Sequence, residues 1–150
     1  MTIAADALHR RCAFFSSVFK LQLSTFFHDW NGDPAKWASH LGQMLVHSDE
    51  LSVKLFDCTR RNIRRMAQDG RFPPPSMRSA SGNSGGVWFV QTVEYWLAKY
   101  TELEDQHPEN ASRENAEQAT VLSIAFDSDL KNLLQRKFRD GVKVHAQTLA

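Results

Sequence analysis

Three consecutive prolines, Pro73 to Pro75, constrain the fold more than any other feature of this 150-residue sequence. Proline fixes its own φ and lacks a backbone N–H, so a helix cannot run through this point. Before the prolines, apolar residues recur at spacings of three and four, which is typical of amphipathic helices. After them, "SMRSASGNSGGVWFV" places two short runs around a loop of serine, glycine and asparagine. The sequence therefore predicts helices before the prolines and a β-hairpin after them.

The helix boundaries before the prolines are marked by capping residues. Asp33 followed by Pro34 is a strong helix start, because the carboxylate caps unpaired amide groups and proline suits the first helical position. Thr59 is a second cap, and Gly70 can end a helix in the left-handed conformation. The predicted helices cover residues 3–28, a segment from Pro34 that buries Trp37, Leu41, Met44 and Leu45, residues 48–56, and Arg60 to about Asp69.

Two further helices are predicted after the hairpin. The first covers Gln91 to Tyr100, and the second runs from about Ser112 to Gly141. Between them, the acidic residues 101–111 contain Pro108 and are interpreted as a linker or a frayed helix end. The apolar stripes predicted for these helices are Val93, Trp96, Leu97 and Tyr100, and then Leu122, Phe126, Leu130, Leu133, Leu134 and Phe138.

These elements predict a mainly α fold with a small β-hairpin wing. A short helix, a tight turn, a basic helix and a two-stranded hairpin follow one another in the order of a helix-turn-helix with a wing. The winged helix-turn-helix core is expected to be flanked by N-terminal and C-terminal helices. The predicted parts are an N-terminal helical extension (1–47), the winged DNA-binding domain (48–100), an acidic linker (101–111) and a C-terminal amphipathic helix with its tail (112–150).

The helix predicted from residue 60 carries its arginines on one side. At 100° per residue, Ile63, Met66 and Ala67 fall together and should face the core, whereas Arg61 and Arg65 fall opposite. Like charges this close destabilise a helix by roughly 0.2–0.5 kcal/mol per pair, so helix stability does not explain them. A solvated basic face is the alternative interpretation. The candidate DNA-binding residues are Arg60, Arg61, Asn62, Arg64, Arg65 and Gln68, with Arg71 just after the helix and Arg78 and Asn83 in the predicted wing.

The net charge of +1 conceals a split between two segments. Residues 51–78 hold seven basic and two acidic residues, a local balance of +5, and residues 101–117 hold one basic and six acidic residues, a balance of −5. Because attraction of a polyanion depends on where charge is concentrated, the first segment is the candidate nucleic-acid surface.

The span from Leu55 to Leu97, within about residues 49–100, resembles a known family. "TRRNIRRMAQDGRFPPP", Trp88 at the second wing strand and "VEYWL" at residues 93–97 are similar to the excisionase-like winged-helix domain of AlpA-type phage regulators, which is related to the DNA-binding head of MerR-type activators. The resemblance implies a small transcription regulator or a recombination directionality factor of a mobile element. It also implies double-stranded DNA as partner and an integrase or other protein as a further partner.

Two other functions remain open at this point. A protein-interaction adaptor on a winged-helix scaffold would use the basic helix against an acidic partner. A small terminase-like DNA-packaging subunit is the remoter alternative. The C-terminal helix either packs on the chain's own core or forms a homodimer, and its tail has a local charge of +4 over residues 131–145.

Enzyme, metal and cofactor chemistry have no support in the sequence. The histidines and cysteines lack the spacing of a zinc site, and no nucleophile motif is present. Asp127 and Asp129 are two residues apart on a predicted helix, so they should lie on different faces. No stretch reaches the roughly 18 apolar residues needed to cross a bilayer. Two cysteines fit a reduced cytoplasmic protein, which is the expected localisation.

Overall fold

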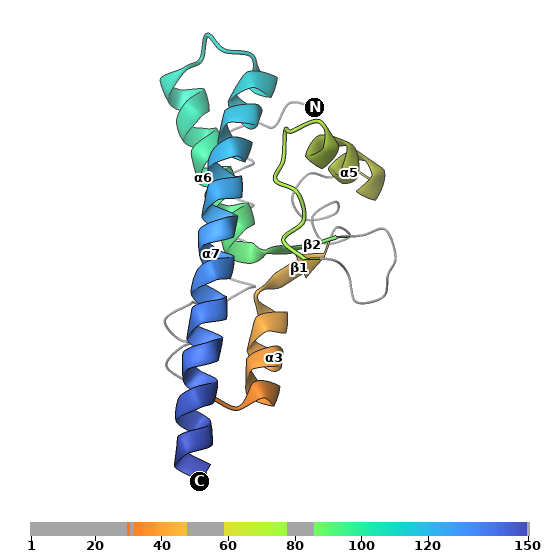
Figure 1. Cartoon of the computed structure of the whole chain (residues 1–150). Coiled ribbons are helices and arrows are strands. Elements are labelled where there is room, and N and C mark those ends of the chain that lie inside the picture. The colour runs from red at the N-terminus through yellow and green to blue at the C-terminus, as the bar shows by residue number, and fades with distance from the viewer. Residues whose placement is uncertain (1–29, 31, 48–58, 78–85, 150) are drawn as a thin grey trace.

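The computed structural model describes residue 30 and residues 32–47, 59–77 and 86–149, with residue 60 and residues 144–149 described in their backbone only. Its elements, in chain order, are α3 (Pro34–Gln43), β1 (Leu45–His47), α5 (Arg60–Gln68), β2 (Val87–Phe89), α6 (Val90–Gln106) and α7 (Ser112–Leu149). This part is mainly helical with a small sheet of two strands, as predicted. Figure 1 shows α6 and α7 side by side and the sheet at mid-height of α7, with α5 above it and α3 below. The helices predicted over 3–28 and 48–56 lie outside the described residues.

The sheet pairs differently from the predicted hairpin. β2 is the expected second strand, but its partner is β1, which places Leu45 opposite Phe89 in an antiparallel register. The expected first strand contributes only an isolated bridge between Met77 and Val87. The prediction that Leu45 continues the preceding helix is wrong, because the chain turns at Met44 and extends to pair with β2. Of the predicted tip, residues 79–86, only Gly86 lies within the described residues.

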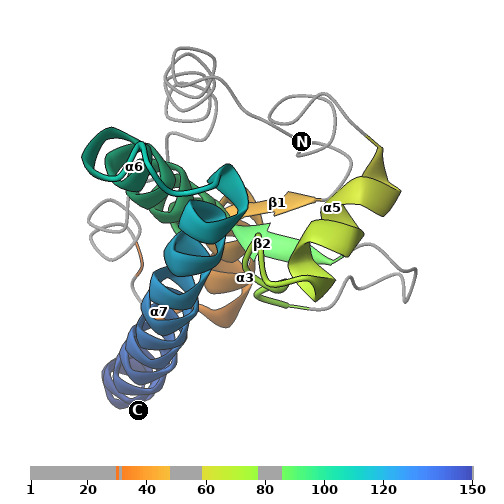
Figure 2. The same ribbon diagram turned by 90° about the horizontal axis from the view of Figure 1, so that it is seen from above.

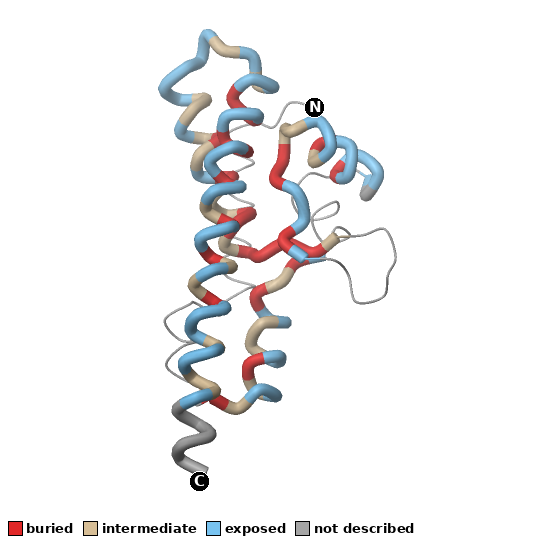
Figure 3. The backbone as a smooth tube through the Cα atoms, viewed as in Figure 1, coloured by how far each residue is buried: buried red, intermediate tan, exposed pale blue. Residues whose placement is uncertain are grey.

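The side chains of the two strands alternate between two cores, because successive residues of a strand point to opposite faces. Figure 3 shows buried residues in both strands of the sheet and at intervals along α7. One core joins β1, α5, α6 and the start of α7 through Val46, Ile63, Met66, Phe72, Trp88, Val90, Val93, Trp96, Leu97, Tyr100, Ala116 and Ala119. The other joins α3, β2 and the middle of α7 through Trp37, Met44, Phe89, Leu130 and Leu134. The stripe predicted for α6 is therefore confirmed.

The start of α3 follows the predicted capping. The carboxylate of Asp33 accepts a hydrogen bond from the backbone N–H of Ala35 at 3.1 Å, and Pro34 occupies the first helical position. Trp37 is buried and packs edge-on against Trp30, with ring centroids 4.4 Å apart. Residues 34–47 thus contribute Trp37, Met44 and Val46 to the buried cores.

Both helices after the sheet are longer than predicted. Residues 101–106, interpreted as part of a linker or a frayed helix end, continue α6, and the connection to α7 is only residues 107–111. α7 starts at Ser112 as predicted, but it does not end at Gly141. Its buried stripe includes Leu130 and Leu134, while Leu122, predicted to be buried, is 43% exposed.

Gly141 lies inside α7. Glycine is needed at this position because an aromatic ring occupies the space that a side chain would fill. A Cβ atom at this position would lie 2.2 Å from Cζ3 of Trp30. That ring is held between Phe138, stacked at 5.8 Å, and Trp37. A glycine that usually signals a helix end is used here for close packing.

Gly141→Ala will lower the free energy of unfolding by about 1–2 kcal/mol, because the clash with a fixed ring outweighs alanine's helix propensity gain of about 1 kcal/mol. The matched control is Gly42→Ala in α3, where nothing lies within 4 Å of the added Cβ. The control should stabilise the protein by up to about 1 kcal/mol. Urea unfolding of both variants measures this, and equal stabilisation by both would contradict the packing of Trp30 against Gly141.

A buried carboxylate ties α7 to the segments around β2. Asp127 is 7% exposed, and its Oδ1 accepts hydrogen bonds from the hydroxyls of Ser76 and, at 2.9 Å, of Thr92. Its Oδ2 lies 3.0 Å from Nζ of Lys131. The Ser76 hydroxyl oxygen also accepts from the backbone N–H of Phe89 at 3.1 Å. Asp127 thus binds polar groups of the segment at Ser76, of α6 and of α7 itself. Asp129 is exposed on another face of α7, as predicted.

Asp127→Ala will lower the free energy of unfolding by about 3 kcal/mol, because two buried hydroxyls lose their acceptor at roughly 1–3 kcal/mol each. Asp127→Asn keeps an acceptor for both hydroxyls and loses only the ion pair with the half-exposed Lys131. Such pairs contribute little, so the asparagine variant should cost about 1 kcal/mol. Chemical denaturation compares the two, and equal losses would show that the hydroxyl contacts contribute nothing.

Candidate nucleic-acid interface

Local signals define both ends of α5. The Thr59 hydroxyl accepts a hydrogen bond from the backbone N–H of Asn62 at 3.3 Å, as an N-cap does. At the other end, Gly70 has a φ of +78°, and its N–H bonds the carbonyl of Ala67 at 3.3 Å. The N–H of Arg71 bonds the carbonyl of Met66 at 2.9 Å, which completes a Schellman motif. The predicted helix and its stop are confirmed.

The inner side of α5 is anchored in the first core. Ile63 is fully buried and Met66 is 6% exposed, whereas Ala67 is half-buried at the edge. Phe72 follows the helix, is fully buried, and contacts the edge of the Trp96 ring at 5.2 Å between centroids. These contacts fix the rotation of α5 about its own axis, so the residues on its outer side have a defined orientation.

The outer side of α5 is polar and basic. Arg61, Asn62, Arg64, Arg65 and Gln68 are all exposed, as predicted. Among the described residues, no carboxylate lies within ion-pair distance of Arg61 or Arg65. Figure 2 shows α5 at the periphery, across the sheet from α7. The structure therefore brings five of the predicted site residues together on one accessible surface, which we call the α5 outer side.

Charge at the first turn of α5 opposes the helix dipole. Arg60 and Arg61 lie at the N-terminal end, and this turn contains no acidic residue. Cations at the positive end of a helix are unfavourable by about 0.3–1 kcal/mol, whereas an anion there is favourable by a similar amount. The arrangement is unfavourable for the isolated helix and favourable beside a phosphate.

Arg71, the other predicted site residue whose side chain is described, stands apart from this surface. Arg71 is half-buried after the helix, where its guanidinium bonds the carboxylate of Asp69 at 3.1 Å. A phosphate at this position would compete with that ion pair. Arg78 and Asn83 lie outside the described residues, as does the side chain of Arg60.

The C-terminal helix packs on the chain's own core, which was one of its two predicted roles. Its outward side carries Val121, Leu122 and Ile124, which are 68%, 43% and 47% exposed. Self-association through α7 remains a prediction.

Sequence reasoning missed two features that involve α7. One is the Asp127 network, whose only signal is a carboxylate on the same helical face as Leu130 and Leu134. The other is an apolar cavity between α3 and α7, which has no local sequence signal because its walls come from four separate segments.

Within the described ranges, no three His, Cys, Asp or Glu side chains gather as a metal site would require. None of the helices in the same ranges has an apolar stretch long enough to cross a membrane. Comparisons with known protein families, with curated proteins and with solved structures each found no match to this chain.

Proposed function

We propose that this chain is a sequence-specific double-stranded DNA-binding protein that places α5 in the major groove. The observation that carries the proposal is that α5 has a buried apolar side and an exposed basic side. Ile63 and Met66 fix its inner side in a core, and Arg61 and Arg65 stand exposed on its outer side. A helix fits the major groove, and a guanidinium can bond both O6 and N7 of guanine.

The elements around α5 support a winged helix-turn-helix core. The segment between Met77 and Val87 follows the basic helix directly, as a wing does, and its two ends pair in an antiparallel bridge. β2 lies between β1 and this bridge in the sheet. In this arrangement we assign Arg78 and Asn83 to the wing, where they would contact the phosphate backbone or the minor groove.

The proposed biological role follows from the family resemblance of residues 55–97. We propose a transcription regulator or a recombination directionality factor of a mobile element. Both roles require one recognised sequence, so they share the same first test.

Selection of bound duplexes from a random pool at physiological salt is that test. We expect one motif to be enriched, with an affinity that falls linearly with salt on a logarithmic plot, by about 0.9 per phosphate contact. Equal affinity for the enriched and a scrambled duplex would contradict base reading. Weak binding to every duplex, with one acidic protein co-purifying tightly, would favour the adaptor alternative.

A further inference from the structure

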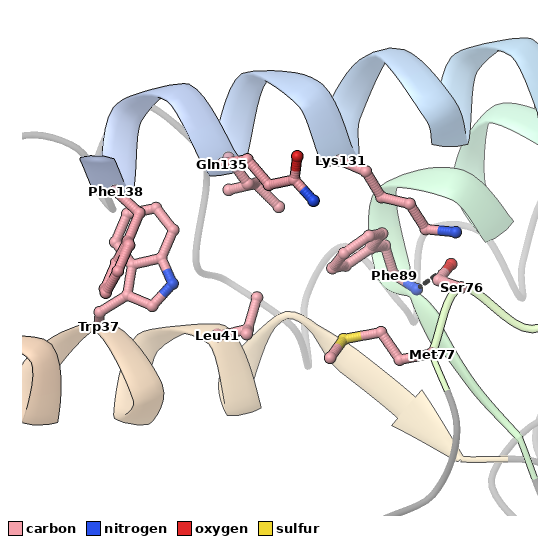
Figure 4. Close-up of a pocket in the computed structure, with 9 residues that line it drawn as sticks. Trp37, Leu41, Ser76, Met77, Phe89, Lys131, Gln135 and Phe138 are labelled. Carbon is pink, nitrogen blue, oxygen red and sulfur yellow. Dashed lines mark hydrogen bonds between the residues drawn. The ribbon is translucent and has the colours of Figure 1, made fainter. Parts of the chain in front are cut away.

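A cavity of about 530 Å³ that is open to solvent lies between α3 and α7, away from the α5 outer side. Its walls are Trp37 and Leu41 from α3, Ser76 and Met77 from the segment before the wing, Phe89 from β2, and Lys131, Leu134, Gln135 and Phe138 from α7. Figure 4 shows the aromatic rings of Trp37 and Phe138 at one end and Lys131 beside Ser76 at the other. The volume is within the range of about 300–1,000 Å³ of small-molecule sites.

The apolar walls are held in place by neighbouring packing. The rings of Trp37 and Phe138 meet edge to face at 5.2 Å, and Phe89 is 2% exposed. The side chains therefore cannot easily collapse into the space. An apolar body entering the cavity would remove apolar wall surface from water, which is favourable in proportion to the area buried.

The polar end of the cavity is formed by the Lys131–Asp127 ion pair, of which only Lys131 lines the space. The Lys131 side chain is 41% exposed, and its ammonium lies 3.0 Å from Asp127. Asp127 is buried, also accepts from Ser76 and Thr92, and is not among the described residues that line the cavity. An ammonium has three donors, and this ion pair engages one carboxylate oxygen, which leaves donors for an anionic group. The exposed amide of Gln135 is one helical turn away and points toward the same space (Figure 4).

We propose that this cavity binds a small amphipathic carboxylate, with an aromatic or medium-chain aliphatic body between Trp37, Phe89 and Phe138 and its head at Lys131. Lys131 is the one ionisable side chain among the described lining residues, so its ammonium favours an anionic head group, and the apolar walls favour an apolar body. Binding here does not depend on the proposed function, since none of the cavity's residues belongs to α5.

Calorimetric titration of the full chain with sodium decanoate, below its micelle concentration, tests the proposal. Decanol and decyltrimethylammonium are titrated in parallel. We expect saturable one-to-one binding of decanoate, weaker binding of decanol, and none of the cation. Equal binding of the three probes, many weak sites, or no heat at millimolar decanoate would overturn the proposal.

Variants locate the site. Lys131→Gln should weaken decanoate binding about tenfold while leaving decanol unchanged, and Lys131→Arg should restore it, since a charge-assisted hydrogen bond is about twice as strong as a neutral one. Arg136→Gln, an exposed cation of the same helix outside the cavity, is the control. Leu41→Trp, which fills the cavity from a half-buried position, should abolish binding of both probes. Unchanged affinity in Lys131→Gln and Leu41→Trp would contradict the site.

Light scattering of the same samples measures the oligomeric state and so distinguishes a small-molecule ligand from a second copy of the chain in the cavity. If a second copy of the chain fills the cavity, Leu41→Trp will convert a dimer into a monomer, and decanoate will do the same. That result would overturn the proposal of a small-molecule site.

Discussion

Replacing both Arg61 and Arg65 by alanine will lower affinity for the selected duplex by about a thousandfold. Each arginine that bonds a base edge contributes about 1–3 kcal/mol, and about 4 kcal/mol for the two corresponds to that factor. Both side chains are exposed and lie opposite the buried Ile63 and Met66, so their removal should leave the fold intact. Fluorescence anisotropy with the enriched and scrambled duplexes, at several salt concentrations, measures the change. Circular dichroism verifies the helix content.

Two control variants separate charge from hydrogen-bond geometry. Lysine at both positions keeps the charge but loses the planar fork that pairs with guanine. The lysine pair should retain affinity for the scrambled duplex and its salt dependence, while losing preference for the enriched one. Arg113→Ala removes an exposed cation of α7 that pairs with Glu117 at 3.1 Å. This variant should change neither the affinity for the scrambled duplex nor the preference for the enriched one. If the lysine pair binds like the wild type, the arginines act only as charges and the base-reading role is wrong.

Trp96→Ala will lower the free energy of unfolding by about 3–5 kcal/mol, the largest stability effect that we expect from one substitution. The side chain is fully buried, its ring stacks on Tyr100 at 5.2 Å, and it meets the edge of Phe72 at the same distance. Its Nε1 donates to the Thr120 hydroxyl at 3.1 Å, which joins α6 to α7. A domain of this size is stabilised by only about 5–15 kcal/mol, so this loss is a large fraction of the total.

Thr120→Val separates the hydrogen bond of Trp96 from its packing. This variant removes the acceptor and keeps a similar volume, so it should cost about 1–2 kcal/mol, well below the alanine effect. Thermal and urea unfolding of both variants provide the comparison. A Trp96→Ala protein as stable as the wild type would show that the first core does not depend on this contact, and the support of α5 through Phe72 would need another explanation.

Short-range signals in the sequence predicted α5 almost completely. Its cap at Thr59, its stop at Gly70 and its apolar side all depend on residues within one or two turns. The same holds for the start of α3 at Asp33. For this reason, the basic surface could be assigned residue by residue before its geometry was known.

Features that depend on distant parts of the chain were not predictable in this way. β1 is only three residues long and forms because β2 pairs with it. Such a short segment shows no alternating hydrophobic pattern from which a strand could be predicted. Gly141 has the sequence signature of a helix end, yet the approach of Trp30 from more than 100 residues earlier explains why it sits within a helix. The segment with Glu102, Glu104 and Asp105 was interpreted as a linker or a frayed helix end, because its charge and Pro108 are local signals, whereas the packing of Leu103 on the first core is not.

Coupling between one arginine and one base tests most directly whether the α5 outer side reads DNA sequence. Guanines of the enriched duplex are replaced singly by 7-deazaguanine, which removes the N7 acceptor, and binding is measured with wild-type, Arg61→Ala and Arg65→Ala proteins. We predict that at least one guanine gives a loss of affinity with the wild type that disappears in one of the two variants. Fully additive losses at every guanine, for both arginines, would contradict the assignment of α5 as the recognition helix.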